Sequence, residues 1–158
     1  GVVKETPRNF ELIIYDGYHL AVPDQTVDLV FSYQFLEHLH PDDVSLHFQM
    51  VKRILRPGGA YVFSTPHRFS GPHDISAHFS DTPQGFHLKE WTYGEMGELL
   101  KSVGFSGWYA YRSGQPRRSG FINRSNLALE ALLGAVPIKL RRALSARLFQ
   151  GVTMLVKA

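Results

Sequence analysis

The sequence contains no cysteine, which excludes a disulfide framework and any metal site built on thiolates. It also lacks a signal peptide and an apolar run long enough to cross a membrane. A Gly-rich G-x-G-x-x-G loop is missing as well, because only fifteen residues precede Asp16 and none of them fits that pattern. The chain begins with Gly1 rather than Met, which suggests a piece of something longer.

The residues that are present fit one globular domain. Hydrophobic residues make up 44% of the 158 positions and aromatic residues 13%, which is enough to form a core. The formal net charge of +3 is mild, and the excess lies mostly in residues 112–147. Such a small excess favours a solvated face over a nucleic-acid surface. We expect no nucleic-acid partner, no membrane contact and a cytoplasmic location.

Short apolar runs in the first half predict strands of a parallel sheet. Residues 10–15 (FELIIY) end at the turn Asp16-Gly17, and residues 27–32 (VDLVFS) are a second run. Nearly continuous apolar runs are typical of strands that are buried on both faces. A helix opens near Pro41, residues 60–64 form a third strand, and we interpret Gly58-Gly59 between them as the end of the helix. A strand, a helix and a strand in this order predict a βαβ unit.

The second half begins with a long irregular stretch, residues 67–91, which is rich in His, Gly, Pro and Ser. Loops of that length inside a compact domain are usually functional or mobile. Thr92 and Glu95 then form a T-x-x-E capping box for a helix that ends at Gly104. The elements expected after it are a strand at 105–111, a linker at 112–119, helices at 127–136 and 138–148, and a last strand at 152–156.

Four segments in this order resemble the class I S-adenosylmethionine-dependent methyltransferases of the small-molecule type. They are Asp16-Gly17, VPDQTVDLVFSYQFLEHL (22–39), LRPGGAYVFSTP (55–66) and HLKEWTYGEMGELLKSVGF (87–105). The resemblance implies an α/β, Rossmann-like methyltransferase fold, here partial, with a mostly parallel sheet and an antiparallel last strand. Residues 1–158 would form a single partial domain, with a lid at 67–91 and a linker and helical insertion at 112–148.

The resemblance also assigns the strands. The predicted strands would be the third to seventh of the family fold, with the seventh antiparallel between the fifth and the sixth. The first strand, its Gly-rich turn and the acidic residue after the second strand have no counterpart in the sequence. The predicted strand at 27–32 therefore lacks one usual neighbour, and an open strand edge invites pairing with another chain.

The cofactor implied by the resemblance is S-adenosylmethionine. Asp16 would accept a hydrogen bond from the adenine amino group, and Gly17 would lie beside it. Ser32, Tyr33 and Gln34 would lie near the methionine end of the cofactor.

Methyl transfer mainly requires alignment of the two reactants, and an acceptor hydroxyl also calls for a base. The candidate bases are His38, His67, His73 and His87, of which we single out His38 and His73 as catalytic; for His38, a packing role is the more common alternative. Glu37-His38 further resembles the E-x-x-E-H run that holds a divalent metal in ubiquinone-pathway O-methyltransferases. Gln34 stands at the first position of that run, so the ligand set is incomplete and we predict no metal site.

The predicted function is methyl transfer from S-adenosylmethionine to a small or medium-sized acceptor, in the first place at oxygen, in the intact parent protein. The alternative is a truncated, inactive α/β module that acts as an interaction domain. A nicotinamide-dependent dehydrogenase half is a weaker third interpretation. The expected partners are the small-molecule acceptor and a second copy of the chain, which would pair through the open sheet edge.

Overall fold

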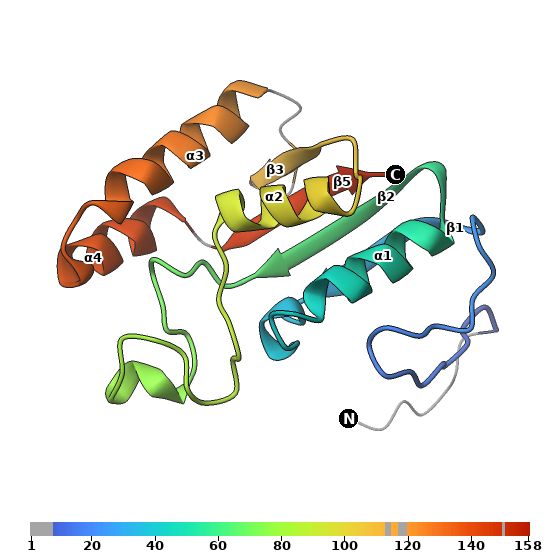
Figure 1. The fold of residues 1–158 in the computed structure, drawn as a ribbon, viewed down its shortest axis with the longest axis horizontal. Helices are drawn as coiled ribbons and strands as arrows, with labels where there is room; N and C mark the ends of the chain where they lie inside the picture. Colours follow the sequence, from blue (N-terminus) through green and yellow to red (C-terminus); the bar gives the residue numbers. More distant parts are fainter. Residues whose placement is uncertain (1–7, 113–114, 117–119, 150) are drawn as a thin grey trace.

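A computed structural model describes residues 8–112, 115–116, 120–149 and 151–158. The described residues form one mixed sheet with the strand order β1-β2-β5-β3-β4 (Figure 1). The strands are β1 (Val27–Tyr33), β2 (Leu55–Thr65), β3 (Trp108–Arg112), β4 (Gln115–Pro116) and β5 (Val152–Lys157). The helices are α1 (Val44–Ile54), α2 (Tyr93–Ser102), α3 (Gly120–Gly134) and α4 (Ile138–Leu148), with short 3-10 turns η1 (Leu36–His38) and η2 (Ile75–His78).

The pairing of the strands confirms the predicted fold class. β1 and β2 are parallel, with Val30 opposite Tyr61, as a βαβ unit through α1 requires. The last strand, β5, runs antiparallel between β2 and β3. These positions are the ones that the family resemblance implies for its fourth to seventh strands.

One face of the sheet carries the core. α1 and α2 lie side by side on this face, and α3 and α4 lie at the other end of the molecule from β1 (Figure 1). Val44, Phe48 and Val51 recur at helical spacing on α1 and are fully buried, and the Phe48 ring packs against Tyr61 and Phe63 of β2. Burying side chains of this size stabilises the fold by about 1.5–3 kcal/mol each.

The prediction that residues 27–32 are buried on both faces is wrong. Leu29, Phe31 and Tyr33 point to one side of β1 and are 59%, 66% and 68% exposed. Side chains alternate along a strand, so an uncovered face exposes every second residue. In the part of the chain that the structure describes, β1 is an edge strand that pairs with β2 alone.

The predicted strand at 10–15 is also wrong, because these residues have no regular structure. Phe10, Leu12 and Ile14 are 52%, 76% and 91% exposed. An apolar run becomes a strand only where another strand offers it hydrogen bonds and a face to cover. No strand of the described residues lies next to this segment.

The turn between α1 and β2 differs from the expected helix end. α1 ends at Ile54, and Leu55 already pairs with Val27 in the sheet. The register then jumps to Leu29 opposite Ala60, so the residues between form a bulge in β2. Gly58 has a φ of +79° in this bulge, a conformation that glycine adopts without strain. Gly58-Gly59 therefore shape the start of a strand and do not cap the helix.

The elements of the second half largely follow the prediction. Both hydrogen bonds of the Thr92–Glu95 capping box are present, and Gly104 has a φ of +88° after the end of α2. α4 has the predicted bounds, whereas α3 begins seven residues before the predicted position. Part of the predicted linker pairs with β3 as β4, and residues 113–114 and 117–119 of it lie outside the described residues.

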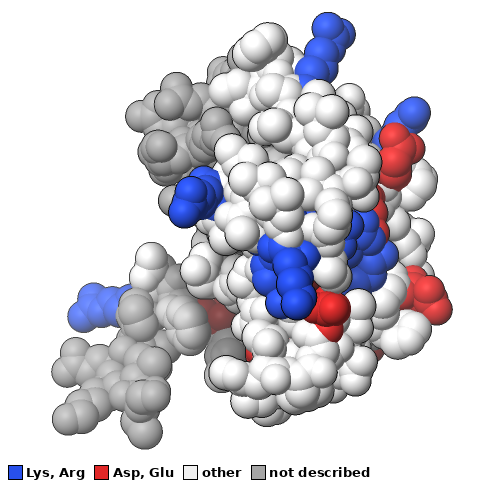
Figure 2. Space-filling view, turned by 90° about the vertical axis from the view of Figure 1, so that its left-hand side faces the viewer, with Lys and Arg blue, Asp and Glu red and all other residues white. Residues whose placement is uncertain are grey.

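The basic helix α4 contacts the long loop through its cations. The guanidinium of Arg141 lies 4.8 Å from the centre of the Phe69 ring, and Arg142 forms a 2.9 Å ion pair with Asp81. The three leucines that recur at helical spacing on α4 remain partly exposed, at 54% for Leu140, 39% for Leu144 and 40% for Leu148. On the side of the molecule seen in Figure 2, basic side chains are scattered and several lie beside acidic ones. None of the described helices is long and apolar enough to span a membrane.

Candidate functional site

The carboxyl ends of β1 and β2 meet at one edge of the sheet, where open α/β sheets bind ligands. Gln34 follows β1 directly, and its N–H donates to the carbonyl oxygen of Ser64 at 2.9 Å. Its φ of +51° is rare for a residue other than glycine. Backbone strain of this kind clusters at functional sites. The 3-10 turn η1 comes next, and the loop 67–91 follows β2 at the same edge.

A buried hydrogen-bond relay joins two of the predicted cofactor residues, Gly17 and Ser32. His47 Nδ1 lies 3.0 Å from the Gly17 carbonyl oxygen, which can only accept, so Nδ1 carries the proton. His47 Nε2 then accepts from the Tyr61 hydroxyl at 3.1 Å. The Ser32 hydroxyl in turn donates to Tyr61 Oη at 2.7 Å. Burial lowers the pKa of His47, which favours the neutral ring that this relay requires.

Asp16 lies beside this relay but is engaged in its own turn. Its Oδ1 accepts from the backbone N–H groups of Tyr18 and His19 at 2.8 and 2.7 Å, and its Oδ2 lies 2.6 Å from His19 Nδ1. The hydrogen bond from the His19 side chain, with those from the two backbone groups, holds the pKa of Asp16 well below its usual range. The carboxylate is thus ionised and exposed, and its hydrogen bonds stabilise the turn at residues 16–19.

Two further predicted cofactor residues end β1. The Tyr33 side chain is exposed, and Gln34 is half-buried. Both follow Ser32 at the edge where the relay from Gly17 arrives. The structure thereby brings Gly17, Ser32, Tyr33 and Gln34 to one end of the sheet.

Glu37 is a fully buried carboxylate at the same edge. Its Oε2 accepts from the Thr65 hydroxyl at 3.0 Å, and its carbonyl oxygen accepts from the backbone N–H of Leu88 at 2.7 Å. Its Oε1 has no hydrogen-bond partner among the described residues. Glu37 therefore connects η1 to β2 and to the loop by hydrogen bonds, and its Oε1 remains available to accept a further contact.

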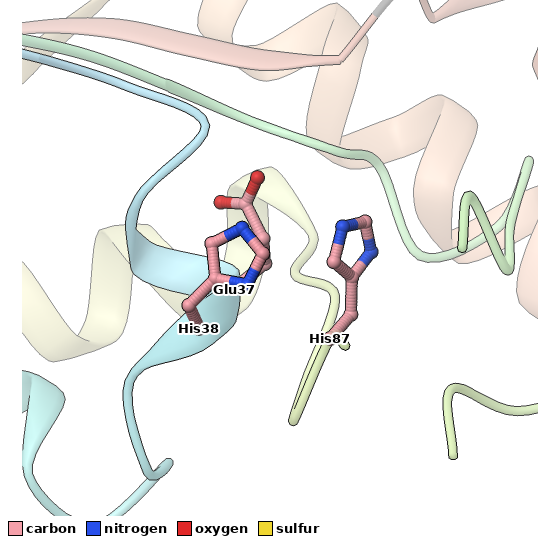
Figure 3. Close-up of side chains that lie close together, drawn as sticks. All are labelled: Glu37, His38 and His87. Carbon is pink, nitrogen blue, oxygen red and sulfur yellow. The ribbon is translucent and has the colours of Figure 1, made fainter. Parts of the chain in front are cut away.

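His38 and His87 face each other across this edge. Their ring centres lie 5.1 Å apart in an edge-to-face arrangement. His38 is exposed, and its Nδ1 lies 2.9 Å from the carbonyl oxygen of Phe86. Figure 3 shows both rings next to the Glu37 carboxylate. His38 thus packs against His87 with one side of its ring and faces solvent with the other.

Glu90 holds two histidines with its two oxygens. Its Oε1 lies 2.9 Å from His87 Nδ1, and its Oε2 lies 3.0 Å from His73 Nδ1. The backbone N–H of His73 also donates to Oε1, at 2.6 Å. Burial raises the pKa of Glu90, but the hydrogen bonds from His73 and His87 outweigh burial and leave the pKa below its usual value. The buried Glu90 carboxylate thus positions both His87, next to η1, and His73, on its far side.

The Asp74 carboxylate links distant parts of the loop through hydrogen bonds to its backbone. It accepts from the backbone N–H groups of Ser76, Gly85 and His87 at 2.9, 3.0 and 3.2 Å. Burial acts to raise the pKa of Asp74, and these hydrogen bonds together lower it to about 2. The loop is therefore ordered by its own polar contacts, which fix the backbone beneath His87.

A cavity of about 370 Å³ lies between the loop and α4. Arg68, Lys89, Glu90, Phe69 and Arg141 are among the residues that line it. Its walls combine aromatic and aliphatic surface with charged groups of both signs, including Asp81 and Glu90, which suits a small acceptor that carries polar groups.

Sequence reasoning missed His47, Tyr61 and Glu90. His47 and Tyr61 are polar residues within otherwise apolar stripes of a helix and a strand, and that interruption is a usable signal. Glu90 gave no signal, because its three contacts join residues that are 3 and 17 positions away in an irregular loop.

Comparisons with known proteins agree with this fold. Residues 2–63 match a family model described as a methyltransferase domain. A probable S-adenosylmethionine-dependent methyltransferase of Mycolicibacterium smegmatis is 39% identical over 90 residues, which cover 54% of this chain and 31% of that protein. A Mycobacterium tuberculosis protein of the same description is 36% identical over 90 residues, which cover 54% of this chain and 29% of that protein. The matched segment thus spans less than a third of either relative.

Solved structures share the fold at low identity. A SAM-dependent methyltransferase from Archaeoglobus fulgidus aligns with a TM-score of 0.57 and 16% identity, over 95% of this chain and 68% of that one. The Haemonchus contortus phosphoethanolamine N-methyltransferase 1, solved with phosphoethanolamine and S-adenosylhomocysteine, aligns with a TM-score of 0.52 and 18% identity, over 92% of this chain and 28% of that one.

Proposed function

We propose that this chain, which has the family and the fold of the class I S-adenosylmethionine-dependent methyltransferases, serves methyl transfer from S-adenosylmethionine to a small or medium-sized acceptor. The observation that carries the proposal is the strand order, with β5 antiparallel between β2 and β3 and polar residues gathered where β1 and β2 end. The prediction of S-adenosylmethionine as the cofactor is confirmed at the level of the family.

Asp16, Gly17, Ser32, Tyr33 and Gln34 are the proposed cofactor contacts. The relay through His47 supports this assignment, because it fixes Gly17 and Ser32 relative to each other through the Gly17 carbonyl oxygen and the Ser32 hydroxyl. The exposed, ionised Asp16 retains acceptor capacity for an amino group.

The acceptor atom is proposed to be oxygen. The leaving group of a sulfonium is already activated, so the protein has to align the acceptor and take up its proton. His38 and His73 are the proposed bases. His38 supports this role best: its Nδ1 faces a carbonyl oxygen, so its Nε2 is the unprotonated atom at the ligand edge. The cavity between the loop and α4 is the proposed place of the acceptor.

Chemical-shift mapping with S-adenosylhomocysteine tests the proposal, since NMR detects binding even in the millimolar range. We expect shift changes at residues 16–17 and 32–34, and their loss in Asp16→Ala. Asp28→Ala is the matched control, because Asp28 is an exposed acid near the opposite end of β1, paired with Arg56. Shift changes elsewhere on the sheet, or an equal response of both variants, would refute the assignment.

A second candidate function is an interaction module. It is favoured by one observation, the exposed apolar side of β1 at the edge of the sheet. A second copy of the chain is the proposed occupant of that edge. Cofactor binding and self-association are measured separately, so the two functions can be told apart.

A further inference from the structure

Three side chains with metal-binding atoms converge at the carboxyl end of β1. Glu37 and His38 come from η1, and His87 comes from the far end of the long loop (Figure 3). Their ligand atoms all lie within 4.8 Å of one another. We propose that these three residues form a binding site for a divalent transition-metal ion, with zinc as the best-suited ion, against the sequence-based prediction of no metal.

The two histidines are held in the tautomer that a metal requires. The carbonyl oxygen of Phe86 can only accept, so His38 Nδ1 at 2.9 Å carries the proton. His87 Nδ1 lies 2.9 Å from the carboxylate of Glu90 and donates to it for the same reason. Both Nε2 atoms are therefore left with free lone pairs, and both point toward the Glu37 carboxylate (Figure 3).

Glu37 supplies the strongest independent observation. The side chain is completely buried, yet its Oε1 has no hydrogen-bond partner among the described residues. Buried polar atoms without a partner are rare in folded proteins, and each one calls for an explanation. A cation bound between Oε1 and the two imidazole nitrogens provides one. The other oxygen, Oε2, is held by the Thr65 hydroxyl and keeps the carboxylate in place.

Each ligand thus has an outer partner, as is usual around protein metal sites. Phe86 orients His38, Glu90 orients His87 and Thr65 orients Glu37. The Asp74 carboxylate adds a further layer, because it binds the backbone N–H groups of Gly85 and His87 and so fixes the loop that brings His87 to the site. A chance meeting of three surface residues would not have this support.

The ligand set indicates which ions fit. Two imidazoles and one carboxylate suit zinc and other late transition metals better than magnesium or calcium, which prefer oxygen ligands. Ligands bound to zinc at about 2.1 Å lie roughly 3.4 Å from one another in a tetrahedron. The ligand atoms lie within 4.8 Å of one another, so the largest of these distances shortens by at most about 1.4 Å when the ion binds. The exposed His38 ring and the loop residue His87 are the parts that can move. Three protein ligands leave an open position for an oxygen ligand such as an acceptor hydroxyl.

This inference does not depend on methyl transfer, because it rests on the three side chains alone. It does change the role of His38: with the ion bound, its Nε2 is a ligand and is no longer a base. His73, which bonds to the other oxygen of Glu90, is then the base that remains.

Zinc titration of the chain by calorimetry, together with thermal unfolding with and without zinc, tests the site. We expect saturable binding at one site and a rise in Tm. His87→Ala and Glu37→Gln should each weaken zinc binding at least tenfold and abolish the rise in Tm. His40→Ala is the matched control, since His40 is an exposed histidine two residues from His38 with no part in the cluster, and it should bind zinc as the parent does.

The fold of each variant is checked by its Tm in the presence of a chelator. Glu37→Gln keeps the shape of the side chain and an oxygen for Thr65, so the test remains decisive if His87→Ala folds poorly. Absence of zinc binding to the parent chain would overturn the proposal. Unchanged binding in either ligand variant, or a loss in His40→Ala equal to that in His87→Ala, would also overturn it.

Discussion

His47 shows how a single buried residue links the local sequence to the site. Its ring bridges α1, Gly17 and β2, and its neighbours Phe35, Phe48 and Tyr61 carry no charge at neutral pH. The ring can accept from Tyr61 only when it is neutral. Burial lowers its pKa in the folded protein, so the unfolded chain takes up the proton first as the pH falls.

The stability that neutral His47 contributes should therefore be fully present above about pH 6.5 and be lost as the pH falls below it toward the lowered pKa. We expect the denaturant midpoint of the parent chain to fall between pH 7.5 and pH 5.5 by more than that of His47→Gln. His40→Gln, which changes an exposed histidine, should behave like the parent. Equal pH dependence of the parent and His47→Gln would show that His47 is not the titrating group.

Gly71 lies against the Glu90 carboxylate so closely that a methyl group at this position would overlap Oε2. Gly71→Ala should push Glu90 away from His73 and His87, and overpacking of this kind costs about 1–3 kcal/mol. The free energy of unfolding and amide exchange of His73, whose N–H donates to Glu90, are the measurements. Gly107→Ala is the control, because a Cβ there meets nothing within 4 Å. Equal stability of both variants would mean that Glu90 can move without cost.

At the scale of elements, Glu130 fastens α3 to α2 and to the long loop. Its two oxygens accept from the backbone N–H groups of Tyr93 and Gly94 at 2.6 and 2.9 Å, at the start of α2. His67 Nε2 donates to the same carboxylate at 2.9 Å, and the His67 ring is stacked on Phe149. The negative carboxylate thus lies at the positive end of a helix and beside a buried histidine.

Glu130→Ala should lower the free energy of unfolding by about 3 kcal/mol, since it leaves buried donors without their acceptor. Amide exchange of Tyr93 and Gly94 should become faster. Glu98→Ala on the exposed side of α2 is the control and should change stability by less than about 0.5 kcal/mol. A loss in Glu130→Ala no larger than in the control would contradict the assigned role.

The elements that could be predicted are those whose signals are local. The Thr92–Glu95 capping box, Gly104 and the apolar spacing of Val44, Phe48 and Val51 each act within one or two helical turns. The strand predicted at 10–15 failed because pairing depends on a distant neighbour. The bounds of α4 could be predicted from its spacing, whereas its contacts with Phe69 and Asp81 could not, because these residues lie in the distant loop.

In the candidate site, too, some residues could be predicted from the sequence and others could not. His38 could be singled out because it follows a strand, and strand ends are where ligands bind. Gln34 is implied by the family resemblance. The partnership of His87 with Glu37 and His38 could not be predicted, because about fifty residues separate them and the Asp74 contacts decide where the loop returns. The tautomers of the histidines follow only from their partners in space.

At the scale of the whole molecule, the chain carries one side of the proposed cofactor site. The sequence has no Gly-rich loop, and no strand precedes β1 in the described residues. Each missing hydrogen bond to the cofactor is worth about 1 kcal/mol, so we expect a dissociation constant for S-adenosylhomocysteine above roughly 100 μM. Calorimetric titration measures it. A micromolar constant on this chain would refute the expectation.

The open edge of β1 is the feature of the whole molecule with the clearest consequence. Its outward N–H and C=O groups pair with no strand of the described residues, and the side chains of Leu29, Phe31 and Tyr33 add an exposed apolar stripe beside them. A sheet edge of this composition, without proline, is a template for another strand. We therefore predict that the chain self-associates through β1.

Light scattering over a concentration series should show a mass that rises above that of the monomer, and amides of residues 27–32 should gain protection from exchange as it does. Phe31→Lys should shift the equilibrium to monomer, because a charge on an edge strand disfavours pairing. Phe79→Lys is the matched control: Phe79 is also 66% exposed but lies beside η2, away from the sheet edge. A monomer mass at all concentrations would exclude self-association. An equal effect of the two substitutions would show that the association does not involve β1.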